Sequence, residues 1–123
     1  MAQITEDYVS YETAKLLKEK GFDGECRDYY NTEGHFYSED FKSDWNNGRG
    51  PITIFSAPTL QMTMKWLRKE HHLNIIVDCY TVHAEARIMT IEDLPACKCR
   101  GIIGEKYEKA YEAAIKYCLE NLI

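Results

Sequence analysis

The spacing of apolar residues near the C-terminus constrains the fold more than any other feature of the sequence. Over residues 106–122, apolar side chains recur at steps of three and four residues, at Tyr107, Ala110, Tyr111, Ala114, Cys118 and Leu122. This spacing predicts an amphipathic helix whose small alanines allow close approach to a sheet. We therefore expect Ala114→Glu to destabilise the protein, whereas Glu112, which lies outside the stripe, should tolerate glutamine.

Two further helices and six extended segments are predicted along the chain. Ser10 is a suitable N-cap for a helix over residues 11–20, which Gly21 can end in the left-handed conformation, with Phe22 packing back on the last turn. A second helix should start within residues 56–59, where a proline is tolerated, and run to about His71. Alternating or β-branched patterns predict extended segments at residues 26–30, 35–45, 52–55, 74–81, 84–91 and 97–103.

The resulting order of elements, α-β-β-β-α-β-β-β-α, predicts an α+β fold in which about three helices pack on a largely antiparallel sheet. A parallel pair would fit where the second helix crosses between strands. A length of 123 residues is typical of one domain, and no repeat or linker divides residues 1–123. We expect one layered domain with one main core.

Composition excludes several classes of protein. An odd number of cysteines, five, and the absence of a charged-then-apolar leader favour reduced thiols in a cytoplasmic protein. No apolar run approaches the length that spans a membrane. A chain of this length can bury a core without a disulfide or metal staple, and no cofactor is expected.

Negative charge and aromatic residues coincide in one segment. Between Asp23 and Asp44 there are seven acids and two bases, which accounts for the whole net charge of −5. Such a segment would repel nucleic-acid phosphates but could bind a basic protein partner through large aromatic anchors. We therefore expect no nucleic-acid ligand. The alternative is a solvated loop with edge strands whose aromatics fold back onto the core. The candidate partner-binding residues here are Tyr37, Glu39, Asp40 and Trp45.

A second candidate surface lies on the second helix. Leu60, Met64 and Leu67 share one face, whereas Met62 and Trp66 point away from it. Methionine and tryptophan are enriched in interface cores, so this side of the helix is an alternative contact surface for a protein partner.

Two stretches resemble known sequences. These are Ser-Ala-Pro-Thr-Leu-Gln-Met-Thr-Met-Lys-Trp-Leu-Arg-Lys from Ser56 and Tyr-Glu-Lys-Ala-Tyr-Glu-Ala-Ala-Ile-Lys-Tyr-Cys-Leu-Glu-Asn-Leu-Ile from Tyr107. Together with the opening helix, they are similar to small uncharacterised proteins of gut anaerobes and their prophages, and more distantly to the phage ABA-sandwich domain. The resemblance implies a layered α/β fold and a mobile-element context. It transfers no catalytic residue, because fold analogy does not establish function.

Cysteines and histidines offer a different function. Cys97 and Cys99 are two residues apart, but a zinc site normally needs a second ligand pair at comparable spacing, and no metal is expected. A thiol nucleophile needs a base within hydrogen-bond reach, and no local motif places one. The candidates for such a site are Cys79 or Cys97 with His71, His72 or His83 and Asp78. The preferred interpretation is a non-enzymatic accessory protein of a phage or mobile element that binds another protein; the alternative is a small cysteine- and histidine-dependent hydrolase or thiol enzyme.

Overall fold

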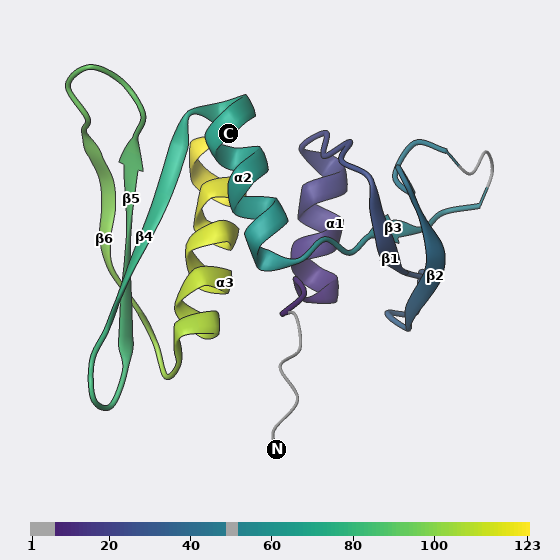
Figure 1. Cartoon of the computed structure of the whole chain (residues 1–123), viewed down its shortest axis with the longest axis horizontal. Coiled ribbons are helices and arrows are strands. Elements are labelled where there is room, and N and C mark those ends of the chain that lie inside the picture. Colours follow the sequence, from purple (N-terminus) through teal and green to yellow (C-terminus); the bar gives the residue numbers. More distant parts are fainter. Residues whose placement is uncertain (1–6, 49–51) are drawn as a thin grey trace.

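Among the residues that the structure describes, three α-helices lie between two separate three-stranded antiparallel sheets (Figure 1). A computed structural model describes residues 7–48 and 52–123. The elements are α1 (Tyr11–Glu19), β1 (Cys26–Tyr30), β2 (Phe36–Ser43), β3 (Phe55–Ser56), α2 (Leu60–His71), β4 (Leu73–Cys79), β5 (Ala84–Thr90), β6 (Cys97–Gly104), α3 (Tyr107–Tyr117) and the π-helical η1 (Cys118–Leu122). The predicted α+β class and order of elements are confirmed.

Capping residues fix both ends of α1. The hydroxyl oxygen of Ser10 accepts a hydrogen bond from the Thr13 N–H at 3.3 Å. At the other end Gly21 adopts a left-handed φ of 87°, and its N–H donates to the Lys18 carbonyl. The Phe22 N–H donates to the Leu17 carbonyl at 2.9 Å, and the Phe22 ring is buried. The predicted glycine-terminated helix end is therefore confirmed.

The two sheets differ in regularity. In the second sheet β5 lies between β4 and β6, while in the first β1 lies between β2 and β3. The predicted strand over residues 52–55 is largely wrong, because only Phe55 of that run belongs to β3. Ile54 instead packs in a small second cluster with Cys26 and Trp45. Every pair among the named strands is antiparallel. The strands β3 and β4, which flank α2, belong to different sheets, so they do not form the parallel pair considered from the sequence.

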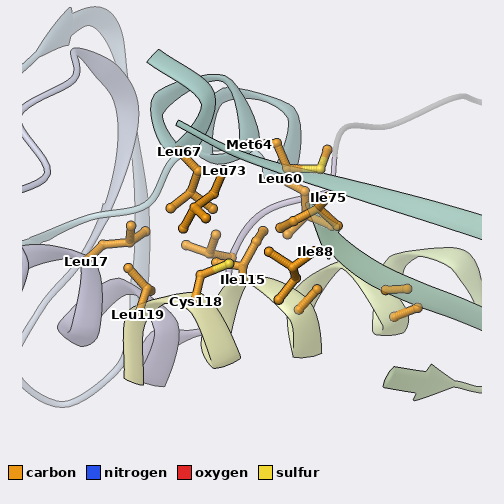
Figure 2. Packing of buried hydrophobic residues seen from close by; sticks show 14 of the residues in the cluster. Leu17, Leu60, Met64, Leu67, Leu73, Ile75, Ile88, Ile115, Cys118 and Leu119 are labelled. Atoms are coloured by element: carbon orange, nitrogen blue, oxygen red, sulfur yellow. The ribbon is translucent and has the colours of Figure 1, made fainter. Parts of the chain in front are cut away.

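The main core forms where the helices meet the second sheet. Figure 2 shows side chains from α1, α2, β4, β5 and the C-terminal helical segment converging there. Apolar burial of this kind contributes about 25 cal/mol per Å² and is the main stabilising term. The labelled members are Leu17, Leu60, Met64, Leu67, Leu73, Ile75, Ile88, Ile115, Cys118 and Leu119.

The C-terminal helix packs closely against the sheet, as its small residues predict. Ala110 and Ala114 are fully buried. Gly104, at the end of β6, lies so close to α3 that a Cβ atom there would clash with the backbone of Lys109 and Ala110. The backbone of α3 therefore approaches this strand at a distance that only glycine permits.

Candidate functional site

Aromatic side chains form a connected row on the face of the first sheet that is turned away from α1. The opposite face carries Tyr30 and Phe55, whose rings contact Tyr11 of α1. On the outward side, Tyr37 stacks on Tyr29 with ring centroids 5.5 Å apart. We call this side, with Tyr29, Tyr37, Glu39 and Phe41, the outer face.

The outer face is open at two positions. The exposed fraction is 44% for Tyr37 and 55% for Phe41. Each exposed ring rests on a less exposed one, because Tyr37 contacts Tyr29 and Phe41 contacts Trp45 at 5.5 Å. The two supporting rings contact each other at 4.8 Å, so the outer face is held in place from beneath.

Trp45, a candidate partner-binding residue in the sequence, is buried and not exposed as contact with a partner would require. Its side chain is only 2% exposed, and its indole Nε1–H donates a 2.7 Å hydrogen bond to the carbonyl of Cys26. Trp45 belongs to the second cluster with Cys26 and Ile54, on which Tyr29 and Met62 pack. Trp45 therefore supports the Phe41 ring from within the fold and is not itself an exposed contact residue.

The two acids of the candidate site differ in environment. Glu39 is half-buried, and its Oε1 accepts a 3.0 Å hydrogen bond from the Tyr29 hydroxyl. Asp40, the next residue along β2, is exposed. Among the residues that the structure describes, neither carboxylate forms an ion pair with a lysine or arginine. Both negative charges therefore remain available to a ligand.

Met62 and Trp66 lie on a different surface. Trp66 is half-buried and packs edge-on against Phe22 at 5.4 Å and against His71 at 4.7 Å. A groove of about 290 Å³ is lined by Phe22, Met62, Trp66 and the two lysines Lys65 and Lys69, among others. A neighbouring hollow of about 470 Å³ shares Met62 and reaches Lys42 on β2, but Tyr37, Glu39 and Phe41 do not line it. The structure thus groups Tyr37 and Glu39 and separates them from Met62 and Trp66.

A further hollow of about 510 Å³ has no counterpart among the sequence predictions. It lies between residues 7–10 and the start of α3, and Lys106, Lys109 and Glu112 line it together with Asp7 and Tyr30. Glu112 is already engaged there, because its Oε1 accepts hydrogen bonds from the Ser10 N–H and the Thr13 hydroxyl. Both acidic and basic side chains line this hollow, so its charge favours neither anionic nor cationic ligands.

The thiols and imidazoles are dispersed over the fold. Cys26 and Cys118 are buried, Cys79 is exposed, and Cys97 and Cys99 are intermediate, all five as free thiols. Burial raises the pKa of both Cys26 and Cys118, which suppresses the nucleophilic thiolate. The His83 ring stacks on Tyr80 and that of His71 packs on Trp66. Within residues 7–48 and 52–123, no thiol is hydrogen-bonded to an imidazole.

Two searches for specific features give negative results for the described chain. In residues 7–48 and 52–123, three or more histidine, cysteine or acidic side chains nowhere converge as a metal site would require. The described helices are also too short or too polar for any of them to cross a bilayer. Neither result identifies a ligand.

Comparison with known proteins does not assign the chain to a family. No protein-family model matches it, and no curated protein or solved structure is significantly similar to it. The geometry of the chain therefore carries the functional argument.

Tyr29 and Phe41 belong to the outer face but were not among the binding residues predicted from the sequence. The spacing Tyr37, Glu39, Phe41 puts the three side chains on one face of a strand, which is a signal visible in the sequence. That signal is weak by itself because the neighbouring Phe36 has the opposite parity and packs against Tyr8 and Tyr30 on the other face. Only the ring contacts distinguish the aromatic residues of the outer face from those of the opposite face.

Proposed function

We propose that the protein binds a basic protein partner through the outer face. The observation that carries this proposal is the arrangement of two exposed aromatic rings, Tyr37 and Phe41, on either side of the Glu39 carboxylate. Aromatic residues are enriched in the anchoring positions of protein interfaces, and a negative charge between them favours a positively charged partner.

Rigid support for the exposed rings favours binding. Tyr29 and Trp45 hold Tyr37 and Phe41 from beneath, so a partner would not need to immobilise mobile side chains. Each rotamer-rich side chain that must be ordered on binding costs roughly 0.5–1.5 kcal/mol. A pre-organised aromatic surface avoids part of this cost, which supports a binding role for the outer face.

Charge adds a long-range component to the same proposal. The segment from Asp23 to Asp44 contains the excess acids of the chain, and Asp40 and Glu39 lie on β2 without a cationic partner among the described residues. A local excess of negative charge of this kind steers a basic protein toward the surface and raises the association rate. Added salt should weaken this steering, because charges beyond about 10 Å are screened at 0.1 M ionic strength.

Site-specific photo-crosslinking in the native host tests the proposal. A photoreactive phenylalanine analogue at Phe41 should capture a protein of net positive charge, and the same analogue at Leu94, which is 87% exposed on the β5–β6 connection, should not. Tyr37→Ala should reduce capture from position 41, whereas Tyr80→Ala, a matched change of a tyrosine 54% exposed in the β4–β5 turn, should not. Equal capture from both positions, or capture unaffected by Tyr37→Ala, would refute the proposal.

We further propose that the partner belongs to the biology of a phage or other mobile element. The support is the resemblance of the stretches from Ser56 and Tyr107 to small prophage proteins. If this context is correct, the transcript should rise when prophages are induced by DNA damage. A constant transcript level, with a neighbouring prophage gene rising as a positive control, would contradict it.

A further inference from the structure

The backbone of β2 has an unpaired edge. The strand order β2-β1-β3 gives β2 a neighbour on one side only within the described residues. β2 is eight residues long and contains no proline. An edge strand of this kind presents a row of backbone donors and acceptors to another chain.

Hydrogen bonds identify which backbone groups point to the free side. The Asn31 N–H donates to the His35 carbonyl at 3.0 Å, so this pair directs its backbone groups inward, between the two strands. Inward and outward residues alternate in a regular antiparallel pair, so Tyr37 directs its backbone groups toward β1, and Phe36 and Ser38 direct theirs outward. Beyond Ser38, the Glu39 carbonyl accepts a 3.0 Å hydrogen bond from the side-chain Nε of Arg27 on β1, so it too lies on the β1 side of the strand.

The register of β1 and β2 leaves part of β2 without a neighbour even on its paired side. Asp28 pairs with Ser38 and Cys26 pairs with Ser43, so four residues of β2 correspond to the single residue Arg27. The backbone of β2 stays extended through this bulge, so Tyr37, Glu39 and Phe41, spaced two residues apart, share the outer face. The side chains that carry the proposed function and the unpaired backbone groups therefore alternate along one strand.

We propose that the partner contributes an extended basic segment that adds to the free edge of β2 as a fourth strand of the first sheet. This inference rests on the proposed function and specifies how the same surface is used. Side chains of an added strand that lie opposite Tyr37, Glu39 and Phe41 would share the outer face with them. We therefore expect apolar, basic and apolar residues at alternate positions of this segment, with the basic residue opposite Glu39 and no preference at the positions between them.

An alternative role for these features is protection of the edge against aggregation. Natural edge strands are often shielded by charged residues, bulges or prolines. β2 has two of these devices, the bulge and the charges of Glu39, Asp40 and Lys42, yet it also exposes three large aromatic rings, those of Phe36, Tyr37 and Phe41. Exposed aromatics increase the tendency of an edge to aggregate, so purely protective selection does not account for Tyr37 and Phe41.

A nine-residue peptide provides the probe. It has valines opposite Tyr37 and Phe41, lysine opposite Glu39 and threonine elsewhere. Its first control replaces lysine by glutamate. Its second control keeps every side chain but carries N-methyl groups on the alternate amides that would pair with β2. Strand addition predicts that each control binds at least about tenfold more weakly, because hydrogen bonds along the edge give affinity and side chains give specificity.

Ser38→Pro is the matching change in the protein. Proline removes an N–H that points away from β1, so the existing pairing with β1 is kept, and proline is tolerated at such edge positions. We expect Ser38→Pro to weaken peptide binding at least about tenfold, and Ser38→Ala to leave it within about twofold. Amide resonances of Phe36 and Ser38 should shift in the wild type on peptide addition, while those of β6 should not.

The outcomes separate this inference from the proposed function. If Tyr37→Ala weakens peptide binding but Ser38→Pro and N-methylation do not, strand addition is wrong and side-chain binding by the outer face stands. If none of these changes has an effect, both proposals are wrong. The melting temperature of Ser38→Pro shows whether this variant is folded. If it is unfolded, the N-methylated peptide still tests strand addition on the wild-type protein.

Discussion

The hydroxyl of Thr13 in α1 donates a 2.6 Å hydrogen bond to the Oε1 of Glu112 in α3. Thr13 is fully buried, and the same carboxylate oxygen also accepts from the backbone N–H of Ser10, the N-cap of α1. One side chain of the last helix therefore holds the start of the first.

Removing the Glu112 carboxylate should destabilise the protein. Glu112→Ala leaves the buried hydroxyl of Thr13 without its acceptor, at an expected cost of about 1–3 kcal/mol in the free energy of unfolding. Glu112→Gln keeps an oxygen acceptor and should cost about 1 kcal/mol, more than the sequence stripe suggested. Urea denaturation measures both values. A stability unchanged in Glu112→Ala would show that this contact between α1 and α3 contributes nothing.

A charge in the buried face of α3 should be far more damaging. Ala114 is fully buried, so Ala114→Glu would place an unpaired carboxylate in the interface between α3 and the second sheet, at a cost of about 3 kcal/mol or more. Ala113→Glu is the matched control, because it adds the same group one position away at a half-buried residue. Thermal denaturation should separate the two variants clearly, and equal melting temperatures would contradict the docking of α3.

Alkaline pH should reveal the buried thiol of Cys118. Burial, assisted by neighbouring Cys99, raises the pKa of Cys118 from its ordinary value of 9.0 to about 12 in the folded protein. The raised pKa means that the unfolded state loses its proton first. Stability from this group is complete below pH 9 and is lost as the pH rises toward 12.

Replacement of Cys118 should flatten that pH dependence. Cys118→Ala is expected to reduce the slope of unfolding free energy against pH by up to about 1.4 kcal/mol per pH unit between pH 9 and 12. Cys79→Ala, at an exposed thiol, should leave the slope unchanged. The same slope in the wild type and Cys118→Ala would argue against a protonated buried thiol.

Periodic features were readable from the sequence because they depend on local geometry. The stripe of Ala110 and Ala114 predicted a closely packed last helix, and Gly21 predicted the end of the first, because a 3.6-residue period and a left-handed glycine are properties of short segments. The two-sheet arrangement was not readable in this way, because strand pairing is set by contacts distant in the sequence.

Burial of individual aromatics was equally hidden. Trp45 and Phe41 have similar local surroundings in the sequence, yet Trp45 is 2% exposed and Phe41 is 55% exposed. The difference arises because the indole N–H of Trp45 donates a hydrogen bond to the carbonyl of Cys26 on β1, whereas the Phe41 ring packs on Trp45 and stays exposed. Glu112 was misjudged for the same reason, since its partners Ser10 and Thr13 lie about a hundred residues away along the chain.

The kinetics of a partner captured at position 41 test the central claim most directly. Stopped-flow measurement should show that Tyr37→Ala speeds dissociation about tenfold or more with little change in association, because an aromatic anchor acts after encounter. Combined Glu39→Gln and Asp40→Asn should mainly slow association and reduce its dependence on salt, because these charges steer the encounter. A dissociation rate unchanged by Tyr37→Ala, together with an association rate unchanged by the two neutralising substitutions, would contradict binding through the outer face and would point to the groove beside Met62 and Trp66.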